Sequence, residues 1–380
     1  MDNIAGSKPT LTWAVHIAVV FLVALWLFPT LGLFVSSFRT ADQIATSGWW
    51  SSLSTQERQV PPIRVEGTER EEGGRFVIEG RLFAAENAEV SAWGTNVNRP
   101  TEFEPGQVAD LGEGVTLTVS ENGAYRLESP VSTAGARLPR VFSTASTPPE
   151  FTLQNYRNIL LDPRNTDGMT KAFFNTLTVT IPATIIPILV AAFAAYALAW
   201  MDFPGRALLI AAIVGLLVVP LQLALIPLLK LHNDIGIGKG YLGTWLAHTG
   251  FGLPLAIYLL RNYMVGLPRE IIECAKVDGA TDFQIFTKII LPLSFPALAS
   301  FAIFQFLWTW NDLLVALVFL IDATGQTTVM TKQIVELLGT RGGNWEILAT
   351  AAFVSIAVPL LVFFAMQKYL VRGLLAGSVK

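Results

Sequence analysis

Residues 264–296 (MVGLPREIIECAKVDGATDFQIFTKIILPLSFP) place a run of charged side chains between two apolar stretches. Intervals of three or four residues give one helical face to Glu270, Glu273, Val277 and Ala280. Carboxylates spaced in this way lie together on one side of a short surface helix. Such a face can bind a partner protein, and a partner that displaces the helix also moves the apolar stretches on both sides.

The rest of this segment predicts a second short helix. Gly279 breaks or bends the first helix, and Asp282 is a suitable capping residue for the next one. The second helix has an apolar face formed by Ile285, Phe286, Ile289 and Ile290. Pro292 starts the following apolar stretch, at a position where a helix tolerates proline. We expect this segment to lie across a membrane surface.

No arrangement of side chains in the sequence indicates catalysis or metal binding. The three histidines, His16, His232 and His248, are isolated from other potential ligands. Cys274 is the single cysteine, and its neighbours do not indicate a reactive thiol. The sequence has no loop of the form GxxxxGKS or GxxxxGKT, so any ATP must be bound by another chain. We expect a protein that is not an enzyme and that holds no cofactor or metal.

Six apolar stretches are long enough to cross a hydrocarbon core of about 30 Å. They are residues 11–38, 172–200, 207–231, 242–263, 289–321 and 347–369. The first is too long for a cleaved signal peptide, so we expect it to be retained. The net charge of −3 gives no indication of nucleic-acid binding.

The distribution of Lys and Arg predicts the orientation of these stretches. The loops on one side carry Lys8, Arg206, Arg261, Arg269, Lys276, Lys288, Lys368, Arg372 and Lys380. The alternate loops carry only Lys230, Lys239, Lys332 and Arg341. By the positive-inside rule, both termini and the 264–288 connection lie in the cytoplasm.

The segment between the first two stretches is polar and acidic on balance. RFVIEGRLF at 75–83 and VTLTV at 115–119 resemble strands, and Asn122-Gly123 then leads into AYRLE, which predicts a hairpin. Residues 143–150 are typical of a linker. The predicted fold is an all-α polytopic membrane protein with six transmembrane helices and a β-rich extracytoplasmic insert between helices 1 and 2. Its parts are the first helix (1–38), the insert with its linkers (39–170) and the transmembrane domain (171–380).

The charged segment resembles the EAA loop of ABC importer permeases, whose pattern is E-A-A-x3-G-x9-I-x-L-P. The pattern positions are Glu273, Cys274, Ala275, Gly279, Ile289, Leu291 and Pro292, with cysteine in place of the middle alanine. The resemblance implies that this loop binds a partner ATPase. The neighbouring residues Glu270, Asp278 and Ala280 complete the candidate coupling set. The alternative is an ordinary connector whose charges form a solvated face.

Residues 171–380 resemble the smaller permease subunit of maltose-type carbohydrate importers. The segments that carry this resemblance are FFNTL at 173–177, VPLQLALIPL at 219–228, LWTWNDLL at 307–314 and GLLAGSVK at 373–380. The long insert is similar to the alpha-glucoside branch. The resemblance implies a bacterial inner-membrane complex with a second permease, a dimer of ATP-binding subunits and an extracytoplasmic sugar-binding protein. The carbohydrate substrate follows from the resemblance alone.

Polar residues inside the predicted spans have two open interpretations. Asn311 and Asp312 follow Trp308 and Trp310 in the fifth stretch, and Gln222 lies in the third. Polar groups in a membrane face a cavity or a neighbouring helix. These residues either line the translocation path, with the indoles stacking on sugar rings, or form interhelical hydrogen bonds and an interfacial belt. In maltose-type importers the other permease makes most of the sugar contacts.

Two further segments gain a role from the resemblance. The outer loop 322–345 resembles the loop that reaches into the binding protein, and glycines make it flexible: Gly325, Gly339, Gly342 and Gly343. The tail 373–380, which contains Gly377 and Ser378, is expected to insert between the two ATPase subunits. The alternatives are a plain connector and a frayed terminus.

Two rival functions come from other classes of protein. An ion-driven secondary transporter needs ionisable groups deep in its spans, and Asp312 is the only candidate. A membrane-anchored sensor that uses the insert needs a cytoplasmic signalling domain, and the sequence shows none. We therefore expect a permease that works by alternating access, in which a second chain supplies the energy.

Overall fold

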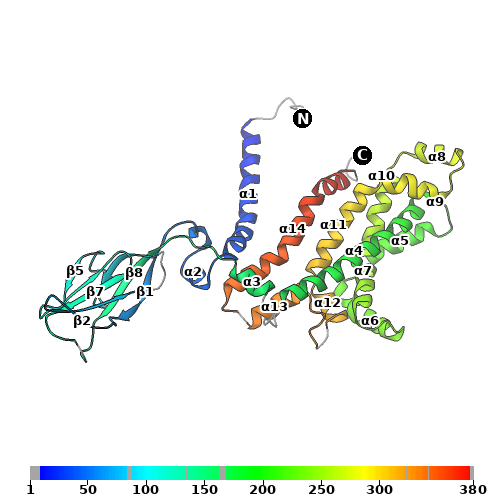
Figure 1. Cartoon of the computed structure of the whole chain (residues 1–380). Helices are drawn as coiled ribbons and strands as arrows, with labels where there is room; N and C mark the ends of the chain where they lie inside the picture. Colours follow the sequence, from blue (N-terminus) through cyan, green and yellow to red (C-terminus); the bar gives the residue numbers. More distant parts are fainter. Residues whose placement is uncertain are drawn as a thin grey trace. The chain divides into compact units, whose positions relative to one another are not determined.

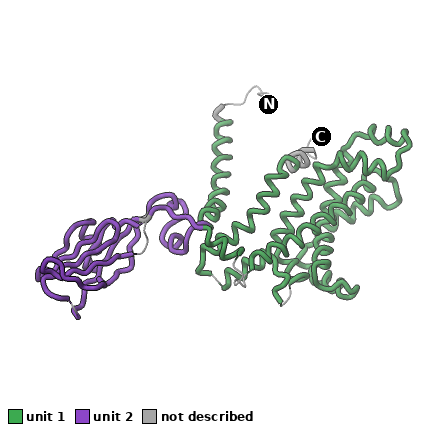
Figure 2. The backbone as a smooth tube through the Cα atoms, in the orientation of Figure 1, with its two compact units in different colours: residues 1–37, 153–380 green, residues 38–152 purple. Residues whose placement is uncertain are grey.

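The computed structural model describes residues 9–83, 88–133, 135–161, 168–321, 324–340 and 342–376. The chain divides into two compact units, drawn in different colours in Figure 2. Unit 1 comprises residues 1–37 and 153–380, and unit 2 comprises residues 38–152. Unit 2 contains one hydrophobic core, and the other core clusters lie in unit 1.

Unit 1 is built from helices (Figure 1). In chain order they are α1 (Pro9–Ser36), α3 (Gln154–Leu160), α4 (Met169–Trp200), α5 (Arg206–Leu216), α6 (Leu221–Asp234), α7 (Tyr241–Val265), α8 (Arg269–Val277), α9 (Asp282–Ile285), the π-helical turn η2 (Phe286–Ile290), α10 (Leu291–Leu293), α11 (Phe295–Asn311), α12 (Leu314–Phe319), α13 (Met330–Thr340) and α14 (Trp345–Ala376).

Among the described residues, three helices are long and apolar enough to cross a membrane: α1, α4 and α14. Two more stretches qualify only as bent pairs, α5 with α6 at 110° and α9–α10 with α11 at 70°. This gives three to five candidate spans, and the predicted count of six is not confirmed. The predicted span 242–263 forms the helix α7, whose first half carries the buried polar residues Thr244, His248 and Thr249.

The predicted spans 207–231 and 289–321 are broken rather than continuous. The first breaks before Pro220, because proline has no N–H group to extend the preceding helix. The second becomes a straight helix only at Phe295, after a bend, and ends again before Asp312, whose backbone is extended. The sequence identified both stretches as apolar but did not predict their bends.

The core of unit 1 forms where α4 packs against α7 and where α11 packs against α14. Ala191, Ala195 and Ala256 are fully buried in this core. Such small side chains let helix backbones approach closely within a membrane protein. The same cluster continues into the charged segment through Ile272, Ile285, Phe286 and Ile290.

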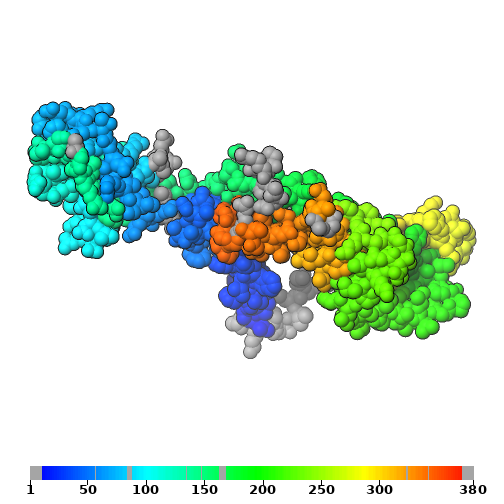
Figure 3. Space-filling model, turned by 90° about the horizontal axis from the view of Figure 1, so that it is seen from below, coloured from blue at the N-terminus to red at the C-terminus, as the bar shows by residue number. Residues whose placement is uncertain are grey.

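The two ends of unit 1 carry different elements (Figure 1). At one end lie α8 and α9, with the beginning of α1 and the C-terminal half of α14. At the opposite end lie α6, α12 and α13. Figure 3 looks onto this second end, where the surfaces of α6 (yellow-green) and α13 (orange) are visible.

Unit 2 contains two antiparallel sheets, with strand orders β1-β8-β4 and β2-β3-β7-β6-β5. The strands are β1 (Gln56–Arg64), β2 (Arg70–Glu72), β3 (Arg75–Arg81), β4 (Glu89–Gly94), β5 (Val108–Asp110), β6 (Thr116–Val119), β7 (Ala124–Ser129) and β8 (Arg140–Thr147). Two short helices, α2 (Ala41–Thr46) and η1 (Trp49–Ser51), precede them. Alternate residues of β6 and β7 are buried, and the core includes Trp93, Leu117 and Leu127.

The structure confirms the predicted hairpin and corrects the predicted linker. β6 pairs with β7, and Gly123 in the connecting turn has a φ of +77°. Asn122 Oδ1 accepts a hydrogen bond from Ala124 N at 3.0 Å. The segment 143–150 begins inside β8 rather than forming a linker, because β8 pairs with both β1 and β4. The segment is rich in small hydroxylated residues, which favoured a linker in the sequence, although its first part belongs to β8, the central strand of the sheet.

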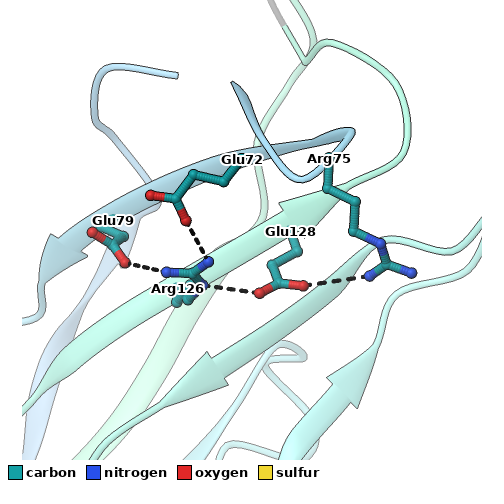
Figure 4. Close-up of polar contacts among 5 residues, drawn as sticks. All are labelled: Glu72, Arg75, Glu79, Arg126 and Glu128. Atoms are coloured by element: carbon teal, nitrogen blue, oxygen red, sulfur yellow. Dashed lines mark hydrogen bonds and ion pairs between the residues drawn. The ribbon is translucent and has the colours of Figure 1, made fainter. Parts of the chain in front are cut away.

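The outer face of the five-stranded sheet carries an ion-pair network (Figure 4). Arg126 contacts three carboxylates, Glu72 at 2.8 Å, Glu79 at 2.7 Å and Glu128 at 2.9 Å. Arg75 lies 3.4 Å from the other oxygen of Glu128. Hydrogen bonding to Arg126 holds the pKa of Glu128 below its usual range. The network ties β2, β3 and β7 together at the surface.

The boundary of unit 2 differs from the predicted end of the insert. Unit 2 ends at residue 152, whereas the prediction extended to residue 170. Helix α3 belongs to unit 1 because Asn155 Nδ2 donates to Ser37 O at 2.9 Å. The hydroxyl of Tyr156 also lies 2.7 Å from Ser37 Oγ. Polarity alone does not reveal this attachment of a short polar helix to the end of α1.

Candidate functional site

The first helix of the charged segment, α8, ends in a Schellman motif. Gly279 N–H donates to Lys276 O at 3.0 Å, and Ala280 N–H donates to Ala275 O at 2.9 Å. Gly279 has a φ of +78°, a conformation that glycine adopts without strain. Ala280 therefore lies beyond the helix and does not share its face, contrary to the prediction from spacing alone.

The two sides of α8 have different surroundings. Ile272 and Ala275 are buried in the core of unit 1. Glu270, Glu273 and Cys274 point outward and are exposed, as is Asp278 just after the helix. The exposed side thus carries carboxylates together with the exposed cations Arg269 and Lys276, and the buried side fixes the helix to the rest of the unit.

The second part of the segment begins at a different cap from the one predicted. Thr281 is the capping residue: its Oγ1 accepts from Gln284 N at 3.3 Å, and Gln284 Oε1 accepts from Thr281 N at 2.9 Å. Asp282 occupies the first helical position instead. A threonine followed three residues later by glutamine is the sequence signal that could have identified this cap.

The apolar face of the second part is largely buried. Ile285, Phe286 and Ile290 belong to the core of unit 1, with Ile289 and Leu291 partly buried against it. Pro292 is exposed on α10 and does not begin the next straight helix. The chain bends at Ser294 before α11 starts at Phe295. Within the resembling pattern, the residues after Gly279 therefore mainly pack against the unit.

Two polar contacts and one aromatic cluster attach the segment to α4 and α7. Tyr196 of α4 lies 3.4 Å from Asp282, and the Tyr263 hydroxyl of α7 donates to Leu293 O at 3.2 Å. The Phe286 ring lies 4.7 Å from that of Phe193 and 5.2 Å from that of Tyr196. The charged segment is therefore joined to α4 and α7 through a packed core rather than through a flexible loop.

Trp310 and Asn311 have partners within unit 1. Trp310 is buried, donates from Nε1 to Ser355 O at 3.0 Å, and stacks on Phe306. Asn311 is exposed, and its Nδ2 donates to Leu307 O at 2.8 Å. Trp310 thus joins α11 to α14 in the way that the interhelical alternative described.

Trp308 lines a hollow of about 500 Å³ between α5, α6, α7 and α11. Its mostly apolar wall includes Leu221, Phe251 and Leu255, and Gln305 supplies an amide. Gln222 is exposed at the start of α6 and is not among the residues that line this hollow. Trp308 and Trp310, two positions apart, therefore have different surroundings.

Sequence reasoning missed Gln305. Its Nε2 donates to Ala183 O at 3.1 Å and lies 3.5 Å from His248 O. A Cβ at Gly252 would lie 2.5 Å from Gln305 Oε1, so a side chain at this position of α7 would displace the amide. A glutamine in an otherwise apolar stretch was the available signal.

Asp312 connects three elements at the end of α11. Its Oδ2 accepts from Val315 N at 2.9 Å and lies 3.7 Å from His248 Nε2. Its backbone oxygen accepts from Thr331 Oγ1 of α13 at 3.1 Å. The His248 ring in turn meets the Trp308 ring edge-on at 5.4 Å. His248 is thus isolated in the sequence but not in the structure.

The predicted flexible loop 322–345 is mostly helical in its described part. α13 includes Gly339, whereas Gly325, Gly342 and Gly343 lie in bends and turns. Buried Met330 and Leu337 anchor one face of α13, because the chain there has helical apolar spacing. Gly377 and Ser378 lie outside the described residues.

Asn175 and Thr176, in the FFNTL segment, hold the start of α13 in place. Asn175 Nδ2 donates to the backbone oxygens of Gln326 and Thr328, each at 2.9 Å. Thr176 Oγ1 accepts from Met330 N at 2.9 Å. Sequence reasoning used this segment only for its resemblance and did not identify these contacts.

The family comparison covers most of the helical unit. Residues 166–375 match the family described as "Binding-protein-dependent transport system inner membrane component". The chain belongs to this family. The match includes α8 with its exposed carboxylates and the hollow beside Trp308.

Individual relatives extend the similarity beyond these residues. The chain is 60% identical, over 98% of both chains, to the alpha-glucoside transport system permease protein AglG of Rhizobium meliloti. It is 50% identical to the osmoprotective compounds uptake permease protein GgtD of Synechocystis sp., over 75% of this chain and 96% of the relative. It is 34% identical to the trehalose transport system permease protein SugB of Mycobacterium tuberculosis, over 61% of this chain and 84% of the relative.

Family membership decides between the classes of function considered from the sequence. The chain is a multi-pass inner-membrane permease of an ABC importer, and it is a transport protein rather than an enzyme. The ion-driven transporter and the sensor are not favoured. The apolar helices α1, α4 and α14 agree with this membrane location.

Proposed function

We propose that this chain forms, with a second permease subunit, the translocation path for an oligosaccharide of the alpha-glucoside class. A dimer of separate ATP-binding subunits drives the import. The observation that carries this proposal is the charged segment 264–296, which we call the coupling segment. Its exposed Glu270 and Glu273 stand on α8, whose buried side belongs to the same core as α4 and α7. The identity of 60% to an alpha-glucoside permease, over nearly the whole chain, supports the substrate class.

In the proposed mechanism the ATPase binds the exposed side of α8, which carries Glu270 and Glu273. ATP binding draws two such helices together, one from each permease, and the packed core passes the movement to α4, α7 and α11. The hollow then opens to the outside, and hydrolysis reverses the change. Packed helices move as nearly rigid bodies, so a small displacement at α8 can produce a larger one at the far end.

The proposed topology has six spans, with both termini and α8 in the cytoplasm. It counts α7 and each bent pair as one span. The Lys and Arg distribution supports it. So does the grouping of α8 with the beginning of α1 and the C-terminal half of α14 at one end of unit 1. Unit 2 follows the first span and is then extracytoplasmic, as are α12 and α13.

The substrate-facing residues in this proposal are those of the hollow. Trp308 offers an indole face for a sugar ring, and Gln305 offers a polar edge. Asp312 and Trp310 instead position helices, because Trp310 bonds to α14 and Asp312 bonds to α12. An extracytoplasmic sugar-binding protein delivers the substrate, and the exposed side of α13 is its docking candidate.

The docking role is tested with Glu273→Gln in the assembled transporter. We expect weaker retention of the ATPase and slower sugar uptake, because the variant removes a charge from the exposed side of α8. Asp234→Asn is the matched control, since it removes an exposed carboxylate at the end of α6. Normal assembly and uptake for Glu273→Gln would refute the docking assignment.

The substrate class is tested by uptake in proteoliposomes. Labelled maltose, sucrose and trehalose are supplied with the binding protein, with and without ATP. We expect ATP-dependent accumulation of at least one of them. Accumulation driven by an ion gradient without ATP would overturn the mechanism, and ATP-driven uptake of none of them would overturn the substrate class.

The role of the insert is tested by removing residues 49–148. We expect the shortened chain to insert in the membrane but to engage the binding protein weakly or to be less stable. The measurements are membrane yield and binding-protein-stimulated uptake. Full uptake by the shortened chain would show that the insert is dispensable.

A further inference from the structure

A break between α11 and α12 creates a mechanical problem for the outer part of unit 1. α11 ends at Asn311 and α12 begins at Leu314, so residues 312 and 313 interrupt the helical hydrogen bonds. An interruption of this kind allows the two pieces to move independently unless side chains hold them. Asp312 stands in this break.

The contacts of Asp312 reach from α13 to the hollow. Its backbone oxygen accepts from Thr331 Oγ1, in the first turn of α13, at 3.1 Å. Its carboxylate accepts from Val315 N at 2.9 Å, which fixes the start of α12. The same carboxylate oxygen lies 3.7 Å from His248 Nε2 of α7. The side chains of Asp312 and His248 are 8% and 1% exposed.

His248 continues this chain of contacts toward the hollow. Its ring meets the Trp308 ring edge-on at 5.4 Å, with an angle of 82° between the planes. Its backbone oxygen lies 3.5 Å from Gln305 Nε2. Trp308 and Gln305 both line the hollow. Asp312 is therefore the residue at which α13, α12 and this wall meet.

We propose that Asp312 is a positioning residue of the transport cycle, which fixes the start of α13 to His248 and, through the His248 ring, to Trp308 in the wall of the hollow. The proposal rests on the proposed function, in which a binding protein docks on α13. Displacement of α13 on docking then reaches Trp308 through the buried side chains of Asp312 and His248. We call these contacts of Asp312 the clamp. Without the clamp the binding protein still docks, but the displacement of α13 no longer reaches the hollow.

The test uses the complete transporter in nanodiscs, with the binding protein added. Asp312→Ala removes the carboxylate that accepts from Val315 N and its contact with His248. We expect the ratio of binding-protein-stimulated to basal ATPase activity to fall about fivefold. Asp312→Asn keeps an oxygen that can accept from Val315 N, so it should recover part of this ratio. An Asp312→Ala variant with the wild-type ratio would overturn the proposal.

A milder pair of variants separates signalling from folding. Thr331→Val removes the hydroxyl that bonds to Asp312. Thr340→Val removes a hydroxyl whose bond, within the described part of the chain, stays inside α13, to Glu336 O at 2.8 Å. We expect Thr331→Val to lower the stimulated-to-basal ratio about fivefold with binding-protein affinity changed less than twofold. Thr340→Val should change neither. Equal effects of the two variants, or a parallel loss of affinity and stimulation, would refute the clamp.

Hydrogen exchange distinguishes failure of the clamp from failure of the proposed function. In the complex without the binding protein, Asp312→Ala should speed exchange at both the first turn of α13 and residues 245–250. Exchange that rises at neither place refutes the clamp. If exchange does rise at both places in Asp312→Ala but the binding protein does not stimulate the wild-type transporter, the clamp stands and the proposed function is refuted.

Discussion

The left-handed backbone at Gly279 allows a quantitative test of the coupling segment. Gly279 has a φ of +78°, and no atom lies within 4 Å of the Cβ that alanine would add. Gly279→Ala therefore has a backbone cost without a clash, about 1–2 kcal/mol. This cost lowers the ratio of ordered to disordered conformations at the end of α8 about 5- to 30-fold. Gly279→Asn should cost less, because asparagine tolerates the left-handed conformation.

The assay compares hydrogen exchange and ATPase coupling in the assembled transporter. The amides of Gly279 and Ala280 donate to Lys276 O and Ala275 O, so their protection reports the Schellman motif directly. We expect both protection and ATP-driven uptake to decrease in the order wild type, Gly279→Asn, Gly279→Ala.

Gly236→Ala is the matched control for this series. Gly236 has a φ of +82°, also with no atom within 4 Å of an added Cβ, at the end of α6. Its substitution has the same backbone cost but lies far from α8 in the sequence and at the other end of unit 1. Wild-type protection in Gly279→Ala, or an equal loss of coupling in Gly236→Ala, would refute the reasoning.

Three further predictions concern other parts of the chain. Hydrogen bonds from Ser132 and Thr133 lower the pKa of Glu69 from its usual 4.5. The carboxylate therefore stabilises unit 2 above pH 4.5, and this stabilisation is lost as pH falls through the lower folded pKa. Hydrogen exchange in unit 2, corrected for its intrinsic pH dependence, should show this loss, and Glu69→Gln should remove that part of the pH dependence. Trp310→Phe leaves Ser355 O without its donor and should destabilise unit 1 by about 1–3 kcal/mol in thermal unfolding; Trp308→Phe should instead change uptake more than melting, and a reversed pattern would contradict the assignment. Cys274→Ala should leave transport unchanged, and maleimide labelling of exposed Cys274 should fall when the ATPase binds; labelling that is equal with and without the ATPase would argue against docking there.

The coupling segment shows how far spacing alone can predict a site. The positions of Glu273, Gly279 and the apolar residues of the second helix were all predicted, because local sequence determines helix faces and left-handed ends. Ala280 was placed on the wrong face, and Asp282 was given the capping role that belongs to Thr281. These errors arose because spacing was extended past the end of α8 and the threonine–glutamine pair was overlooked.

The polar residues of the fifth stretch show where sequence reasoning stops. Trp308 and Trp310 are two positions apart in one apolar stretch, yet one lines a hollow and the other bonds to α14. His248 appeared isolated because its neighbours Asp312 and Trp308 are about sixty residues away in the chain. Contacts of this length depend on which helices pack together, and a single sequence does not specify that packing.

By itself, the sequence predicted an apolar, multi-pass permease with an exposed charged helix, because hydrophobic length, charge placement and short motifs are local properties. The tertiary structure alone decided where the spans bend and that α3 belongs to unit 1 rather than to unit 2. It also decided that Gln305, Asn175 and Asp312 join elements that are distant in the sequence. Each of those outcomes depends on backbone and side-chain groups from distant segments finding partners in a packed interior, where an unsatisfied polar group is costly.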